Sequence, residues 1–194
     1  MKSFLIILFY FCFNFVFSQD SIIEYYNEVA GKPEYGNKNS NGFRKWTQDV
    51  NIFFDFENSD SIKIYSKEIL KDLNDLINPI NLEIVNNKNE ANILLYFGDF
   101  IDYKIKYNIK NDGSFLGYAS TRGVNNVILN SYIFINKKLS GTELKSVLRE
   151  EITQSLGFCN DSWKYPKSIF YQGKNLNTQF SEIDKKIIQL HYNN

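Results

Sequence analysis

The spacing of hydrophobic residues changes along the first half of the chain, and the changes predict an alternation of strands and a helix. Apolar residues occupy every second position in "DVNIFFDF" (49–56), which predicts a strand. In "SDSIKIYSKEILKDLNDLI" (59–77) they fall on one stripe at helical spacing instead. The short apolar runs "NLEIV" (81–85) and "NILLYFG" (92–98) predict two more strands. A strand, a helix and a strand in this order favour a parallel βαβ unit.

The second half of the chain has patterns that predict two more strands and then a helix. "FLGYAST" (115–121) predicts an edge strand, and "NVILNSYIFIN" (126–136) predicts a central one. "GTELKSVLREEITQSLG" (141–157) has helical periodicity, with Thr142 as its predicted N-cap and Gly157 placed to end it. The predicted fold class is therefore α+β, a twisted sheet with helices that is followed by a small and mostly irregular C-terminal part.

Two further helices are predicted, one directly after the first apolar run and one near the C-terminus. "DSIIEYYNEVAG" (20–31) has the pattern of a short amphipathic helix, and a polar loop rich in Gly and Asn follows it at 32–42. Near the C-terminus, "FSEIDKKIIQLHY" (180–192) places Ser181 and Asp184 where a helix start would have them.

The first residues have the three-part layout of a secretory signal peptide. Lys2 precedes a 14-residue apolar run from Phe4 to Phe17, and the small residue Ser18 follows it. The run is shorter than the roughly 20 residues that span a bilayer. We therefore predict cleavage after Ser18, a secreted or periplasmic protein, and no stable membrane span in the mature chain. The predicted divisions are a signal peptide at 1–18, an N-terminal helix and linker at 19–45, and a folded domain at 46–194.

Charge and cysteine content exclude some classes of function. The chain carries 22 Lys and Arg residues against 22 Asp and Glu residues, whereas recognition of nucleic acid needs concentrated positive charge. We therefore predict no nucleic-acid partner. Once Cys12 is removed with the signal peptide, Cys159 is the only cysteine. The stability of the mature chain is thus expected to come from packing and not from an internal disulfide.

The stretch "LREEITQSLGFCND" (148–161) holds the candidate functional site. Two ligands one helical turn apart, a base directly after the first, and a glycine turn that returns a third ligand make up a zinc hydrolase site. The residues at these places are Glu150, Gln154, Glu151, Gly157 and Asn160, with Asp161 adjacent. Imidazole suits zinc, whereas carboxyl and amide oxygens suit calcium or magnesium. Catalytic zinc is therefore not expected here.

Other interpretations of these residues remain open. The acidic and amide side chains at 150–154 could be the ordinary polar face of an amphipathic helix. Cys159 could be a nucleophile, but no local histidine would activate it, so a small buried residue is the expectation. His191 is the only histidine, and it falls at a helix end where the dipole favours a cation. Five tyrosines either fill the core or line a groove for a peptide or sugar: Tyr103, Tyr107, Tyr118, Tyr165 and Tyr171.

Two resemblances bear on the fold. The stretch 46–157 resembles the N-terminal subdomain of zincin metallopeptidases, and "YPKSIFYQ" (165–172) resembles the Met-turn of metzincins, with Phe170 at the methionine position. The closing "FSEIDKKIIQLHY" is similar to their C-terminal helix. More narrowly, E-E-x-T-Q-x-L-G-x-x-N-D followed by S-x-F resembles the bacterial family called domain of unknown function 2927. The resemblance implies a zincin-like twisted mixed sheet, an active-site-type helix and a small C-terminal subdomain.

The resemblance also implies roles by position. The residues in the three metal-ligand places, the general-base place and the floor of the site are, in that order, Glu150, Gln154 and Asn160, then Glu151, then Phe170. Gly157 and Asp161 would support them. The family supplies a fold but no reaction.

Three hypotheses of function follow. The first is a binding or structural module without catalytic zinc, in which the edge strand at Gly117, Tyr118 and Ala119 offers backbone groups to an extended peptide. The alternative is a hydrolase or peptidase that depends on a divalent cation held by oxygen ligands, with Glu151 as general base. The third is a domain of the cell envelope in which the motif has no present function.

Overall fold

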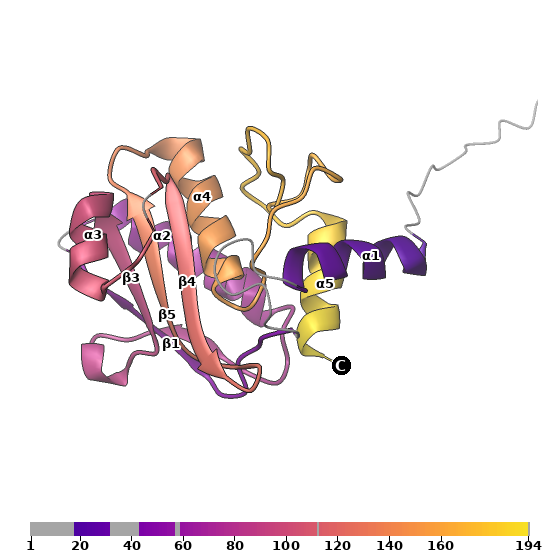
Figure 1. The fold of residues 1–194 in the computed structure, drawn as a ribbon, viewed down its shortest axis with the longest axis horizontal. Coiled ribbons are helices and arrows are strands. Elements are labelled where there is room, and N and C mark those ends of the chain that lie inside the picture. The colour runs from indigo at the N-terminus through magenta and orange to yellow at the C-terminus, as the bar shows by residue number, and fades with distance from the viewer. Residues whose placement is uncertain (1–17, 32–42, 57–58, 112, 194) are drawn as a thin grey trace, which may run out of the picture.

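The computed structural model describes residues 18–31, 43–56, 59–111 and 113–193. The predicted signal peptide, apart from Ser18, and the predicted loop at 32–42 lie outside these residues. None of the described helices is long and apolar enough to cross a membrane. A twisted sheet with helices on both faces forms one part of the molecule, and two helices from the ends of the chain lie beside it (Figure 1).

The sheet has five strands in the order β2-β1-β3-β5-β4. They are β1 (Val50–Phe54), β2 (Leu82–Ile84), β3 (Ile93–Gly98), β4 (Gly117–Val124) and β5 (Val127–Asn136). β1 pairs in parallel with β2 and β3, and β3 pairs in parallel with β5, as the predicted βαβ unit requires. β4 runs antiparallel to β5 at the edge of the sheet, which confirms its prediction as an edge strand. The predicted α+β class with a mixed sheet is confirmed.

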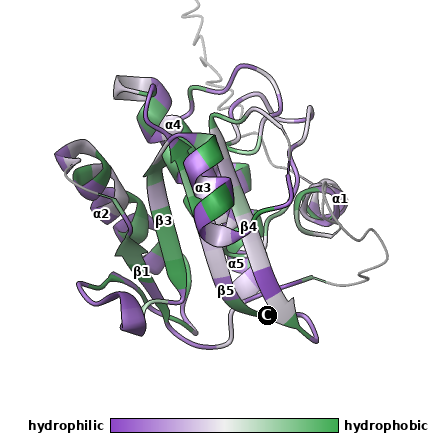
Figure 2. Ribbon diagram, turned by 60° about the vertical axis from the view of Figure 1, so that its left-hand side comes forward, coloured by the Kyte–Doolittle hydropathy of each residue, from purple (hydrophilic) through white to green (hydrophobic). Residues whose placement is uncertain are grey.

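Helices cover both faces of the sheet. α2 (Asp60–Asn74) and α4 (Gly141–Gln154) pack together on one face, and α3 (Phe100–Tyr107) lies across β3 and β5 on the other (Figure 2). Alternate residues of a strand point to opposite faces. Ile133 and Ile135 of β5 therefore belong to the larger core, whereas Phe134 packs with Tyr103 of α3 in a smaller one.

The sequence pattern does not predict α3. This helix has only 8 residues, and it buries Tyr103 and Tyr107 while exposing Ile101 and Ile105. Its apolar residues therefore do not fall on a single stripe, which is the signal that identifies a helix in sequence. Asn108 ends the helix in the left-handed conformation, with φ of 52°.

The two predicted helix starts fare differently. α5 (Glu182–Tyr192) begins with a capping box of Ser181 and Asp184, which confirms its predicted start. α4 begins at Gly141 with Ser140 at the N-cap position, so the prediction of Thr142 is wrong. An acidic residue three positions after the cap favours a helix start. Asp184 stands there relative to Ser181, and Glu143 relative to Ser140, whereas Thr142 is followed by Lys145.

The C-terminal end of α4 is anchored by residues distant in sequence. Trp46 Nε1 donates to Ser155 O at 3.0 Å, and the Tyr192 hydroxyl donates to Leu156 O at 2.7 Å. A helix end leaves such carbonyls without an intrahelical partner. The position of the helix that carries the candidate site is thus fixed by the segment before β1 and by α5.

The N-terminal helix α1 (Gln19–Ala30) packs against α5. Its Tyr26 hydroxyl lies 2.9 Å from Nδ1 of His191 in α5. Its Val29 carbonyl accepts hydrogen bonds from the backbone N–H groups of Cys159 and Asn160, at 2.9 and 3.1 Å. α1 therefore contacts both the last helix and the loop that follows α4.

Candidate functional site

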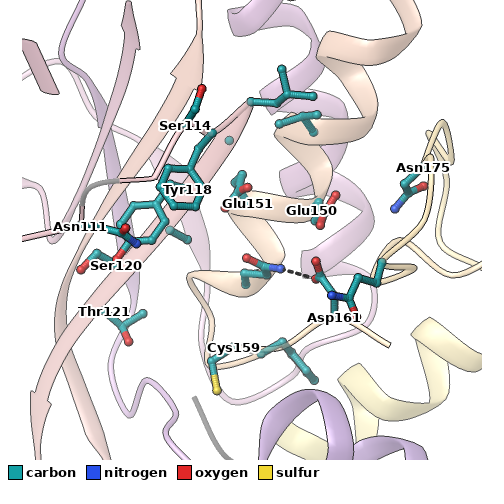
Figure 3. A pocket seen from close by; sticks show the side chains of 18 of the residues that line it. Asn111, Ser114, Tyr118, Ser120, Thr121, Glu150, Glu151, Cys159, Asp161 and Asn175 are labelled. Atoms are coloured by element: carbon teal, nitrogen blue, oxygen red, sulfur yellow. Dashed lines mark hydrogen bonds between the residues drawn. The ribbon is translucent and has the colours of Figure 1, made fainter. Parts of the chain in front are cut away.

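A cleft of about 1250 Å³ lies between β4, α4 and the loop at 171–176. Glu150 and Glu151 of α4 lie in it opposite the strand, and Asp161 lies beside them on the loop that follows the helix (Figure 3). We call these three residues the acidic floor. The structure therefore brings together the three predicted α4 residues Glu150, Glu151 and Gln154, the predicted support Asp161, and the predicted edge strand.

Burial divides the polar residues of α4 between two directions. Leu148 and Ile152 are fully buried in the core. Arg149 is also fully buried, and its guanidinium lies 2.8 Å from the carboxylate of Asp72 in α2. Glu150 and Glu151 follow Arg149 by about 100° and about 200° around the helix axis, and both line the cleft on the side away from Asp72.

Glu151 lies against β4, and Gly117 makes room for it. A Cβ atom at residue 117 would stand 2.4 Å from Glu151 Oε1 and 2.5 Å from Val147 Cγ1. Glu151 is 6% exposed, and its Oε2 atom has no hydrogen-bond partner among the described residues. Burial, and then the charge of Asp161, raises the pKa of the Glu151 carboxyl well above its usual value. The carboxyl is thus held in its protonated form into a higher pH range than a free glutamate.

Glu150, Gln154 and Asp161 form a connected polar group. Gln154 Nε2 donates to Asp161 Oδ1 at 2.9 Å. Burial raises the pKa of Glu150 well above its usual range, and the charges of Asp161 and Glu151 and a hydrogen bond with Asp161 raise it further. The neighbouring carboxyl groups of Glu150 and Asp161 cannot both ionise easily, so one of them keeps its proton and donates it in a hydrogen bond to the other. Sequence reasoning gave Asp161 only a supporting place, because its approach depends on the turn after the helix.

Three further predicted site residues contact other parts of the fold. Asn160 points towards α1, where its Nδ2 donates to Glu28 O at 2.9 Å. Gly157 has a φ of 116°, and a Cβ there would lie 1.9 Å from Arg44 O, so the turn requires glycine. Phe170 is fully buried, with its ring 5.3 Å from that of Phe158. In the described parts of the chain, no group of three or more His, Cys, Asp or Glu side chains is arranged to hold a metal ion.

His191 and Cys159 are both in unreactive states. His191 is buried, with Nε2 3.0 Å from Arg44 O, and burial lowers its pKa to about 4. Loss of water on burial thus outweighs the preference of this helix end for a cation. Cys159 lines the cleft and is partly buried, and burial raises the pKa of its thiol to about 11. A thiol in that state is a weak nucleophile.

The five tyrosines separate into two groups. Tyr118 and Tyr171 line the cleft. Tyr103 and Tyr107 are on the buried side of α3. Tyr165 packs edge-on against Tyr25, with ring centres 4.7 Å apart. An aromatic groove built from all five is therefore wrong, because three of them fill cores.

The outer edge of β4 carries the backbone groups of alternate residues. Asn136 N donates to Leu116 O of the neighbouring segment at 2.9 Å, and bonded and free residues alternate along an antiparallel pair. With the observed register, Tyr118 turns its backbone groups towards β5, whereas Gly117 and Ala119 turn theirs away from the sheet. Of the three predicted edge residues, Gly117 and Ala119 can offer N–H and C=O groups to a bound chain.

The fold is shared with proteins of known structure. Residues 19–194 match the family described as Protein of unknown function (DUF2927). Two structures of the metallopeptidase myroilysin have TM-scores of 0.50 and 0.51 at 12% and 13% identity. The similarity covers 77% and 86% of this chain, and 96% and 93% of the myroilysin chains. No curated protein sequence matches the chain. At this identity the likeness concerns the fold alone, and it confirms the predicted zincin-like, metallopeptidase-type architecture.

Proposed function

This chain belongs to the family Protein of unknown function (DUF2927), and we propose that it is an exported peptide-binding module built on a metallopeptidase-like fold, without catalytic zinc. The observation that carries the proposal is the outer edge of β4, which pairs with no other strand among the described residues and lies beside the cleft. An extended peptide can add to such an edge as a further strand, held by main-chain hydrogen bonds, with specificity from pockets that receive its alternate side chains.

The shape of the cleft supports this mode of binding. Pockets for small ligands usually enclose about 300–1000 Å³, and this one, at about 1250 Å³, has room for several peptide residues. Gly117 and Ala119 are on the same face of β4, because residues two apart share a face of a strand. That face is turned towards Glu151 of α4. A peptide strand beside β4 would therefore pass over the acidic floor.

The residues in the metal-ligand places do not fit zinc. The Asn160 amide donates to Glu28 O, and the Gln154 amide donates to Asp161, both at 2.9 Å. Structural and catalytic zinc sites use three or four ligands drawn from Cys, His and carboxylate side chains. Of the three places only Glu150 supplies such a group. The proposed function therefore does not involve zinc. Hydrogen bonds, and not a metal ion, hold the Gln154 and Asn160 side chains in place.

A hydrolase dependent on calcium or magnesium is the second candidate. One observation favours it, namely that Glu151, in the general-base place, lies in the cleft beside two other carboxyl groups. Burial also raises the pKa of Glu151, and a carboxyl pKa moved towards neutral pH suits a general base. Stoichiometric calcium or magnesium on the purified mature chain, lost in Glu150→Gln, together with peptide cleavage lost in Glu151→Gln, would favour the hydrolase over the binding module.

The binding proposal is tested by changing the backbone of either partner. A library of labelled, terminally blocked heptapeptides is titrated with residues 19–194, and fluorescence anisotropy is measured. We expect binding that weakens about tenfold or more in Ala119→Pro, because proline removes the outward N–H. Ala119→Ser keeps the N–H and should bind as the parent does. Methylation of alternate peptide nitrogens should reproduce the loss.

Two results would contradict the proposal. One is the absence of any bound peptide. The other is binding that survives both Ala119→Pro and peptide methylation. A melting temperature of Ala119→Pro close to that of Ala119→Ser shows that the domain itself is intact.

Export is tested separately. The layout of residues 1–18 supports cleavage after Ser18. The full chain is expressed in a bacterial host, and the N-terminus of the protein outside the inner membrane is read by mass spectrometry. We expect Gln19 as the first residue. Full-length chain that stays in the cytoplasm would contradict export.

A further inference from the structure

We propose that the acidic floor is a subsite for a cationic side chain, lysine or arginine, of the bound peptide. The inference rests on the proposed peptide-binding function and adds to it the chemical class of the ligand. It starts from the position of Glu150, Glu151 and Asp161, which come from two segments of the chain and meet in one cleft. Like charges held together in this way repel each other unless a proton or a cation joins them.

A second observation points to a ligand at this place. Glu151 is 6% exposed, and Oε2 finds no hydrogen-bond partner among the described residues, although it belongs to a residue that lines the cleft. Buried polar groups in native proteins are nearly always hydrogen-bonded, and an unpaired one is destabilising. Donors on a ligand would satisfy this oxygen, and an ammonium or guanidinium group consists of donors only.

Two arginines close to the acidic floor are turned to other partners. Arg149 neighbours both glutamates in sequence but is turned to Asp72, 2.8 Å away, and its guanidinium lies over the Phe180 ring at 4.5 Å. Arg122 lines the cleft, yet its guanidinium donates to Tyr107 O at 3.1 Å and lies over the Tyr132 ring at 4.8 Å. Both arginines are held by other partners. Arg44, Lys110 and Lys174 also line the cleft, yet Glu151 Oε2 has no hydrogen-bond partner among the described residues.

The geometry of β4 selects which peptide side chain reaches the floor. Glu151 packs directly against Gly117, since a Cβ at residue 117 would stand 2.4 Å from Glu151 Oε1, so the acidic floor reaches the edge strand itself. A peptide strand beside β4 points every second side chain to the same face as Gly117. One such side chain, four or more bonds long and ending in a cation, would meet the carboxyl groups. Arginine can bind two carboxylate oxygens at once, and lysine can donate three hydrogen bonds.

The test compares four peptides that differ at one position. The best heptapeptide from the library is made with lysine, arginine, norleucine and citrulline at the position whose side chain faces α4, and each is titrated with the parent chain. We expect the lysine and arginine peptides to bind at least about tenfold more tightly than the norleucine and citrulline peptides. Glu150→Gln and Glu151→Gln should reduce this preference to less than about threefold. Glu143→Gln is the matched control, because Glu143 is an exposed acid on the same helix at the rim of the same cleft.

The outcomes separate this inference from the proposed function. If norleucine binds as well as lysine, the cationic subsite is wrong and peptide binding stands. If no peptide binds, the proposed function fails, and butylammonium and agmatine followed by NMR on the parent and Glu151→Gln chains then test the floor alone. Shifts at Glu150 and Glu151 that need the carboxyl groups support the subsite. Calcium or magnesium binding at the floor, with no response to either amine, would overturn it.

Discussion

Two buried carboxyl groups of this protein, Asp184 and Glu151, differ in how completely they are hydrogen-bonded. Asp184 has no exposed surface, and it accepts hydrogen bonds from Ser181 N and Oγ at 2.8 and 2.7 Å and from Ile169 N at 3.2 Å. The Ser168 hydroxyl adds a fourth bond. Glu151 is almost as buried, yet its Oε2 atom has no hydrogen-bond partner among the described residues.

The difference separates a structural acid from a candidate functional one. Asp184 joins the start of α5 to the Met-turn-like segment, so its burial is offset by bonds that hold the fold together. Glu151 is buried without such an offset, and residues of this kind concentrate in functional sites. Burial raises the pKa of both carboxyls, but at Asp184 the hydrogen bonds from Ser168, Ser181 and Ile169 oppose that rise.

The largest effect is expected from Asp184→Ala. The change leaves buried donors of Ser168, Ile169 and Ser181 without an acceptor, and each unsatisfied group costs about 1–3 kcal/mol. We expect a loss of about 3 kcal/mol or more in the free energy of unfolding, measured by chemical denaturation. Asp184→Asn keeps one acceptor oxygen and should lose less. Equal losses in the two variants would mean that the hydrogen bonds are not what makes this acid structural.

A smaller loss is expected from Gly117→Ala. The new methyl group would come within 2.4 Å of Glu151 Oε1 and 2.5 Å of Val147 Cγ1, and overpacking of this kind costs about 1–3 kcal/mol. Glu151→Ala on the same chain removes half of the clash and should restore part of the stability. A double-mutant cycle by denaturation measures the coupling. Additive changes would contradict the contact between the strand and the acid.

Glu151→Gln should stabilise the chain, by about 1 kcal/mol at neutral pH. The unfolded carboxyl ionises near its ordinary pKa of 4.5, whereas the folded one keeps its proton to higher pH. The unfolded state therefore binds fewer protons, and stability falls as pH rises from 4.5 towards the folded pKa. Glutamine does not titrate, so the gain over the parent should grow between pH 4 and pH 7. A gain that is constant with pH would show that the carboxyl is not held protonated by the fold.

The smallest effect is expected from Cys159→Ser. The pKa of the thiol is raised to about 11 by burial, so at neutral pH it is not a thiolate. We expect slow alkylation by iodoacetamide at pH 7, followed by mass spectrometry, and peptide affinity within about twofold of the parent. Rapid alkylation, or loss of binding in Cys159→Ser, would make this thiol part of the site.

Sequence periodicity was sufficient for elements that bury one side. β1, α2 and α4 alternate between core and surface, and their patterns predict them, whereas α3 buries tyrosines and exposes isoleucines and so has no clear stripe. Within the site, helical spacing was enough to place Glu150 and Gln154 on one face of α4, and both line the cleft. The direction of Asn160 was not predictable, because it depends on Glu28, which is 132 residues away in the chain. The free backbone groups of β4 depend likewise on the register with β5.

The contacts of α1 have a consequence for when the cleft can form. Val29 accepts the N–H groups of Cys159 and Asn160, and Tyr26 meets His191, so α1 docks on segments that are synthesised long after it. Contacts this distant in sequence form late and slowly. A growing chain therefore has no complete docking surface for α1 until α5 has emerged. For a chain threaded across a membrane from its N-terminus, the same order means that the contacts of α1 which hold the loop bearing Asp161 are complete only after α5 has followed.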